Sequence, residues 1–141
     1  MLRLSKKVEY GILALQYLAK NKDDLKTAKE MADDLDISFE FLAKTLQTLK
    51  RKGLVNTIQG MKGGYSLVKS PEEISLFEII SSLENHPEIV ECVNADTCER
   101  EEYCSIKSPM HVIQEKINTI FNEMKLSEFL KQNPKPLELT F

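Results

Sequence analysis

Residues 27–53 constrain the fold most, because they contain two short apolar repeats with only three residues between them. Thr27 and Glu30 have the spacing of a capping box, which predicts that a helix begins there and continues through the sequence AKEMADDL. After the link DIS, Ser38 is placed to cap a second helix. The inward-facing positions expected in that helix are Phe41, Leu42, Thr45, Leu46 and Leu49. Two helices joined by so short a link predict a helix-turn-helix.

A glycine-rich hairpin is predicted directly after this pair of helices. Gly53 follows the basic run KRK and is expected to end the helix in a left-handed conformation. Two strands are then predicted, at residues 54–58 and 65–68, around a tip that contains Lys62 and several glycines. The tip glycines would let the backbone approach a ligand closely. The order of elements is that of a winged helix.

Similar periodicity predicts three further helices. The first spans residues 6–20, and another begins at Ser75, with Glu78 as its capping-box partner. Ser108 and Pro109 are expected to open the last helix, whose apolar residues form a narrow stripe. Because a helix with so narrow a stripe is marginal alone, we expect it to pack against the same helix of a second subunit.

Charge is distributed unevenly along the chain, although the net charge is only −3. Lys and Arg outnumber Asp and Glu by two in residues 1–25 and by three in residues 26–70, whereas Asp and Glu outnumber them by eight in residues 71–141. This distribution favours a basic surface for a polyanion, followed by an acidic region with another role. Neither a signal peptide nor a membrane-spanning apolar run is evident, so we expect a cytoplasmic protein with no membrane partner.

A basic helix-turn-helix with a wing predicts binding to double-stranded promoter DNA, because the second helix of such a motif enters the major groove. Lys44 and Gln47 are candidate base readers, and Glu40 could accept from a cytosine amino group or only stabilise the helix terminus. The full predicted contact set is Ser38, Phe39, Glu40, Lys44, Gln47, Thr48, Arg51, Lys52, Gln59, Lys62 and Tyr65. A homodimer would read a site with two-fold symmetry. The alternative is a winged helix that docks proteins, with lysines that only solubilise its surface.

Three cysteines, Cys92, Cys98 and Cys104, lie at six-residue intervals in an acidic stretch. On a helix this spacing would separate successive thiols by about 240°, so they cannot share a face. A loop can gather them, and thiolates among carboxylates would repel one another unless a metal held them. A lasting disulfide is not expected in a reducing compartment. Zinc and iron–sulfur clusters both commonly take four ligands, so a fourth donor must come from elsewhere, with His86, His111 and Glu9 as candidates.

The predicted fold class is mainly α with a small β wing: a winged helix-turn-helix domain followed by a long C-terminal dimerisation helix. The expected divisions are residues 1–84 for the DNA-binding domain, 85–108 for a cysteine loop that binds a cluster, 109–130 for the dimerisation helix and 131–141 for a flexible tail.

About residues 1–125 resemble the Rrf2 type of bacterial winged-helix regulators, in particular the iron–sulfur group that contains IscR, NsrR and RirA. The resemblance is carried by LRLSKKVEYGILAL in the first helix, TAKEMADDLDISFEFLAKTLQTLKRKGLV in the helix-turn-helix, GMKGGYSL in the wing, and the cysteine spacing. It implies a homodimeric transcriptional regulator, with a repressor favoured. The state of an iron–sulfur cluster would set its activity, in response to nitric oxide, redox state or the supply of iron or clusters.

The resemblance also implies ligands for the cluster. Cys92, Cys98 and Cys104 match the family's cluster ligands, and an acidic ligand from the partner subunit in NsrR-like proteins falls at Glu9. IscR-like proteins have a histidine where this chain has Lys107, so His111 is a weaker candidate and a four-iron-four-sulfur cluster is favoured over a two-iron-two-sulfur cluster. In the wing, Gln59 occupies the position where the family often has arginine. Lys62 would therefore make the minor-groove contact instead.

Two alternatives follow from the same cysteines. A winged-helix regulator could use them to bind zinc or to undergo thiol oxidation. In another class, a small electron-transfer iron–sulfur protein or a cysteine enzyme would also need such thiols, but the chain has no second cluster motif and no convincing arrangement of Cys, His and acid for nucleophilic catalysis. We therefore do not expect an enzyme.

Overall fold

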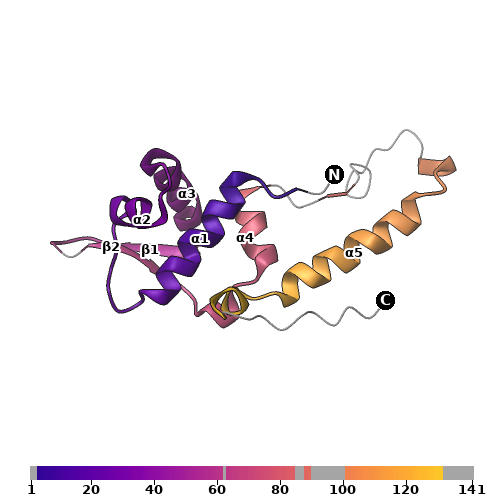
Figure 1. Ribbon diagram of the computed structural model, residues 1–141. Coiled ribbons are helices and arrows are strands. Elements are labelled where there is room, and N and C mark those ends of the chain that lie inside the picture. Colours follow the sequence, from indigo (N-terminus) through magenta and orange to yellow (C-terminus); the bar gives the residue numbers. More distant parts are fainter. Residues whose placement is uncertain (1–2, 62, 85–87, 90–100, 132–141) are drawn as a thin grey trace.

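Helices account for most of the residues that the structure, a computed structural model, describes, which are residues 3–61, 63–84, 88–89 and 101–131 (Figure 1). The α-helices are α1 (Lys6–Lys20), α2 (Ala28–Leu35), α3 (Phe39–Arg51), α4 (Leu76–Leu83) and α5 (Lys107–Glu123). Two strands, β1 (Val55–Ile58) and β2 (Gly64–Leu67), pair antiparallel, and short 3₁₀ turns form η1 (Pro71–Glu73), η3 (Glu101–Tyr103) and η4 (Leu126–Leu130). The predicted fold class, mainly α with a small β wing, is confirmed.

The helix starts follow local capping signals. The Thr27 hydroxyl accepts from the Glu30 amide at 3.2 Å while the Glu30 carboxylate accepts from the Thr27 amide at 2.8 Å, which completes the capping box predicted for α2. Ser75 accepts from the Glu78 amide at 3.0 Å in α4. Ser38 precedes α3 but makes no side-chain capping bond, contrary to expectation.

Helix α5 begins two residues earlier than predicted, at Lys107, so that Pro109 lies at its third position. The difference changes little physically. The first four N–H groups of a helix have no partner within the helix, so proline, which lacks this group, loses no hydrogen bond at the third position. Its α-helical part ends at Glu123, and the chain then turns through η4.

The hydrophobic core lies where α1, α3 and α4 meet, with α2 and β1 closing it. Its fully buried side chains include Val8, Leu15, Met31, Leu42, Leu46, Leu49, Leu54, Val55, Ile79 and Ile80. Gly11 of α1 is buried at this junction, and a Cβ there would lie 2.3 Å from Leu83 Cδ1 of α4. The absence of a side chain at Gly11 thus lets α1 and α4 approach closely.

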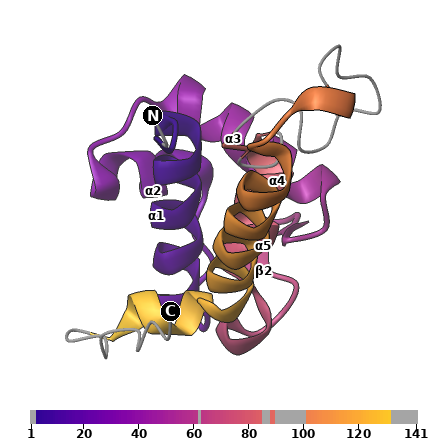
Figure 2. The ribbon, with the colours of Figure 1, turned by 90° about the vertical axis from the view of Figure 1, so that its right-hand side faces the viewer.

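The end of α5 is attached to this core. Main-chain hydrogen bonds join Leu76 N to the Met124 carbonyl and Leu126 N to the Ile74 carbonyl, each at 2.8 Å, and the Leu126 side chain is fully buried. Gln16 of α1 donates to the Phe129 carbonyl in η4. Figure 2 shows η4 against α1 beside the end of α5. The C-terminal helix is therefore fastened to the winged-helix domain at its C-terminal end, and it also contacts α4.

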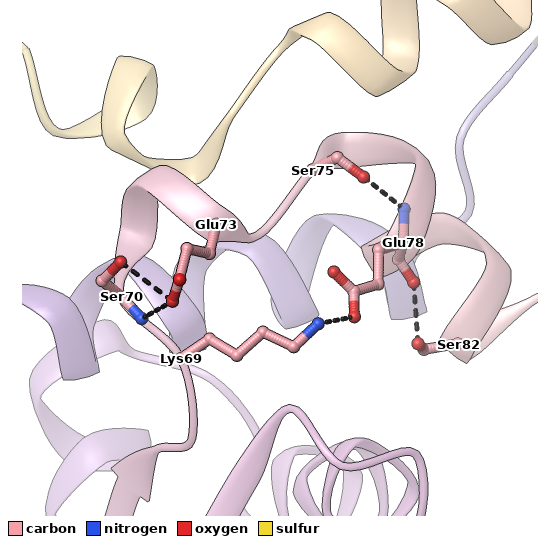
Figure 3. A network of polar contacts seen from close by, with 6 residues as sticks. All are labelled: Lys69, Ser70, Glu73, Ser75, Glu78 and Ser82. Carbon is pink, nitrogen blue, oxygen red and sulfur yellow. Dashed lines mark hydrogen bonds and ion pairs between the residues drawn. The ribbon is translucent and has the colours of Figure 1, made fainter.

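Polar contacts connect the end of the wing to α4 (Figure 3). Lys69, just after β2, pairs with Glu78 of α4 at 2.6 Å. Glu73 accepts from the Ser70 amide and hydroxyl, each at 3.2 Å, and Ser82 donates to the Glu78 carbonyl at 2.7 Å. These bonds fix the turn that leads from the hairpin back to the helices.

Candidate DNA-binding interface

The turn between α2 and α3 is held by backbone bonds and by the core. Asp36 ends α2 with φ 54° and ψ 49°, a left-handed conformation, and the Ile37 amide donates to the Ala32 carbonyl at 3.0 Å. Met31 and Ala32 of α2 are buried in the core cluster that also contains Leu42, Leu46 and Leu49 of α3. The angle between the two helices is thus set by packing, as a helix-turn-helix requires.

A further contact joins α1 to α2. The Tyr17 hydroxyl donates to the Asp34 carboxylate. Partial burial of the ring, together with this hydrogen bond, raises the pKa of Tyr17 to about 12. The phenol therefore stays protonated and keeps donating at physiological pH, which ties the helix-turn-helix to α1.

The outward face of α3 carries the polar residues expected of a recognition helix. Phe39, Glu40, Lys44 and Gln47 are exposed and Thr48 is half-buried, whereas Leu42, Thr45, Leu46 and Leu49 are buried on the other side. Exposed Lys50, Arg51 and Lys52 follow at the C-terminal end. Thr48 donates to the Lys44 carbonyl at 3.1 Å, so its hydroxyl proton is already used. The face can offer base-reading groups near its start and phosphate-binding cations near its end.

The wing projects from the end of the molecule away from α5 (Figure 1). Its register pairs Val55 with Leu67 and Ile58 with Gly64. Gly60 has φ 136°, a backbone conformation that L side chains rarely adopt, and Gln59 and Met61 on either side of it are exposed. Lys62, predicted at the tip, lies outside the described residues.

Tyr65 occupies a different environment from the other predicted DNA contacts. Its side chain is half-buried against the core, and its amide donates to the Lys26 carbonyl at 2.9 Å. Ser38, by contrast, is exposed immediately before the recognition helix. Contact with DNA stays a prediction for these two residues, as it does for every other residue of the predicted set.

The predicted metal ligands are only partly within the described chain. Cys92, Cys98 and His86 lie outside it, whereas Cys104 is a half-buried free thiol three residues before α5. Glu9 on the first turn of α1 is exposed and pairs with Lys6 at 2.8 Å, and this contact raises the pKa of Lys6. Among the described residues, no three His, Cys, Asp or Glu side chains gather to hold a metal.

His111, the weaker candidate, is exposed on α5 with its Nε2 atom 3.5 Å from the Glu115 carboxylate. Gln114, one turn further along, is almost fully buried. It accepts from the Ile89 amide at 2.9 Å and donates to Asn118 at 3.0 Å. The chain before the segment with Cys92 and Cys98 is therefore bonded to α5 through Ile89, and the chain after that segment enters α5 three residues beyond Cys104.

The apolar residues of α5 are mostly not buried within the chain. Ile113 is 45% exposed and Val112 50%, and just before the helix Ile106 is 56% and Tyr103 89% exposed. Figure 1 shows α5 extending away from the wing, with its far end beyond the helical core. The helix thus presents apolar residues that the rest of the chain leaves about half exposed.

Some residues that shape the interface have no local sequence signal. The Tyr17–Asp34 contact joins residues 17 apart and the Gln16–Phe129 contact joins residues 113 apart, so helical periodicity could not predict them. Gln114 is a polar residue within the apolar stripe of α5. This interruption of the stripe was the sequence signal that could have indicated its buried hydrogen bonds. No helix in the described part of the chain is long and apolar enough to cross a membrane.

Comparison with known proteins agrees with this arrangement. Residues 4–132 match the Rrf2 family, described as an iron-dependent transcriptional regulator. The chain is 36% identical over 113 residues to the HTH-type transcriptional regulator NsrR of Shouchella clausii, covering 78% of this chain and 76% of that protein. Among solved structures it resembles CymR, the global cysteine regulator of B. subtilis, with TM-score 0.74 and 26% identity over 92% of this chain and 97% of that one. It also resembles IscR of T. potens, with TM-score 0.72 and 25% identity over 92% and 86% of the two chains. The chain therefore belongs to the Rrf2 family, whose members are DNA-binding transcriptional regulators and not enzymes.

Proposed function

We propose that the chain forms a homodimeric repressor whose affinity for promoter DNA depends on an iron–sulfur cluster held by Cys92, Cys98 and Cys104. The observation that carries this proposal is the set of three cysteines at six-residue intervals leading into α5, in a chain whose family is described as iron-dependent. The signal it senses is nitric oxide, redox state or the supply of iron or clusters. Similarity to NsrR supports this choice.

The donor chemistry of the chain fits such a cluster. Three cysteines supply thiolates, the usual ligands of iron–sulfur clusters, and Cys104 is a free, half-buried thiol. The surrounding carboxylates would repel three bare thiolates, and bound iron would offset that repulsion. When bound, the cluster would supply a group that reacts with nitric oxide or oxygen.

We propose Glu9 of the partner subunit as the fourth ligand, with a four-iron-four-sulfur cluster favoured. Glu9 is exposed on α1, and its present partner, Lys6, is itself exposed. An exposed ion pair of this kind is weakened by solvent and contributes little, so a stronger ligand interaction can displace it. His111 is the weaker alternative, and its exposed ring contacts only the neighbouring turn of its own helix in the described chain.

The proposed dimer uses the apolar surface of α5. Val112, Ile113 and Ile106 are each about half exposed, which is costly unless a partner covers them. Packing α5 against the α5 of a second copy would bury these residues in an interface with two-fold symmetry. The two recognition helices would then read a two-fold symmetric site.

The test is spectroscopy and elemental analysis of protein purified without oxygen. We expect iron and acid-labile sulfide with a visible absorption band, all of which are lost when Cys98 and Cys104 are both replaced by alanine. The matched control is Ser105→Ala, which alters the residue beside Cys104 without removing a thiol. Retention of iron and colour by the double variant would show that the ligand assignment is wrong.

A second candidate is a winged-helix regulator that uses the same cysteines for zinc or for thiol oxidation. The similarity to CymR supports it to the extent that CymR-like members of the family bind no iron–sulfur cluster. Metal analysis separates the two. Zinc without sulfide, or metal-free protein whose DNA binding changes only on thiol oxidation, would favour this candidate. Membership in a family of DNA-binding regulators favours both over a small electron-transfer protein.

A further inference from the structure

Phe39 is a large apolar side chain on the outward face of the recognition helix. It is the first residue of α3 and is 51% exposed. It belongs neither to the buried core cluster nor to the half-buried residues packed against that cluster. The fold therefore gains little from a phenyl ring here, and leaving it in water is unfavourable.

Phe41, two residues further along, provides the contrast. It is 38% exposed, but its ring packs edge-to-face on Tyr10 of α1, with ring centroids 5.2 Å apart. Its place in the fold is explained by this contact between α1 and α3. In the described part of the chain, Phe39 takes part in no such ring contact.

The position of Phe39 on α3 indicates what covers it. Residues four apart on a helix are neighbours, so Phe39 and Ala43 form a short apolar row that continues to Gln47. Beside this row lie exposed Glu40 and Lys44. The early residues of a recognition helix meet base edges in the major groove, where thymine alone presents a methyl group.

We propose that Phe39 is a specificity-determining residue that contacts the 5-methyl group of a thymine in each half-site. The inference rests on the family's DNA binding and on the proposed dimer with its two half-sites, and not on the cluster. Phenylalanine is one of the residue types that recognise this methyl group by apolar contact, and its ring reaches much further from the helix than a methyl side chain would. The basic end of α3, with Lys50, Arg51 and Lys52 all exposed, favours a nucleic acid over an apolar protein partner.

The contact makes a quantitative prediction. Replacing one thymine by deoxyuridine removes only the methyl group. Burial of one such group changes affinity about fourfold, so substitution in both half-sites should weaken binding about 15-fold. Phe39→Ala should bind the thymine operator less tightly and should lose most of this sensitivity to deoxyuridine.

The experiment uses the full chain, purified without oxygen, and a duplex selected from a randomised library of about 30 base pairs, a length of about three helical turns. Each thymine of the selected duplex is replaced by deoxyuridine in turn, together with its two-fold mate. Affinities are measured for the unaltered protein, Phe39→Ala, Phe39→Leu and the control Phe41→Ala. Circular dichroism and thermal unfolding establish that each variant is folded.

We expect one symmetric thymine pair at which the unaltered protein and Phe41→Ala both lose affinity. Phe39→Ala should show almost no loss there, and Phe39→Leu an intermediate one. The proposal is overturned if no thymine pair shows the effect, or if Phe39→Ala keeps the full loss. A chain that selects no duplex and shows no salt-dependent binding to any DNA would instead overturn the DNA-binding assignment itself.

Discussion

Gly64→Ala tests how closely the wing must approach the body of the protein. A Cβ at Gly64, the first residue of β2, would lie 2.6, 2.7 and 2.8 Å from the carbonyl oxygen, carbonyl carbon and nitrogen of Lys26. All three are backbone atoms, so no side-chain rotation can relieve the overlap. The strand must move away from Lys26, which breaks the 2.9 Å bond from the Tyr65 amide to the Lys26 carbonyl.

The expected cost combines two effects. Forcing extra atoms into a packed contact costs about 1–3 kcal/mol, and loss of a backbone hydrogen bond adds about 1 kcal/mol. We therefore expect Gly64→Ala to lower the free energy of unfolding by about 2–4 kcal/mol and to weaken DNA binding, since the wing is displaced.

Urea unfolding measures this cost. The protomer concentration is held fixed, because the stability of the proposed dimer would depend on it. The matched control is Ser66→Ala in the same strand, which removes atoms instead of adding them and should stay within about 0.5 kcal/mol. A Gly64→Ala protein as stable as the control would refute the close backbone approach on which the wing's position depends.

Three other changes test separate parts of the structure. Glu40→Gln removes a negative charge from the exposed face of α3, so binding to non-specific DNA should tighten several-fold and discrimination at any cytosine it reads should fall, as competition binding would measure. Tyr17→Phe should cost about 1 kcal/mol by removing the bond to Asp34. Because the folded-state pKa of Tyr17 is raised from 10.0 to about 12, its contribution to stability is complete below pH 10 and is lost as the pH rises through about 12; absorbance titration of the two proteins would detect this, and identical titrations would contradict it. Leu126→Ala should lower the free energy of unfolding by about 2–5 kcal/mol and loosen the attachment of α5. Unchanged thermal unfolding would mean that η4 does not attach this helix to the core.

Features fixed by neighbouring residues were predictable from the sequence. The start of α2 depends on Thr27 and Glu30, which lie three residues apart, and the sequence predicted it correctly. The stop at Gly53, with φ 81°, follows from a glycine after a basic turn. The start of α5 was misplaced by two residues, because a serine and a proline are compatible with more than one position in a first turn.

Features that depend on distant residues were not predictable in this way. One example is which face of α5 is buried within the chain. Gln114 is buried and bonded to Ile89, while the neighbouring Ile113 is 45% exposed. An apolar stripe predicts that a face will be covered but does not say by which molecule. The outward face of α3 is a second example. Phe39 was predicted from the sequence as a DNA contact, but the proposal of what it contacts needed its exposure and its neighbours in the structure.

The central claim is that the cluster proposed at Cys92, Cys98 and Cys104 governs DNA binding. The most direct measurement compares the affinity of iron-loaded and iron-free protein for the same promoter duplex, without oxygen and at one salt concentration. We predict that loss of iron weakens binding at least about 10-fold, within the usual range of coupling between two sites. Equal affinities for the two forms would contradict the account.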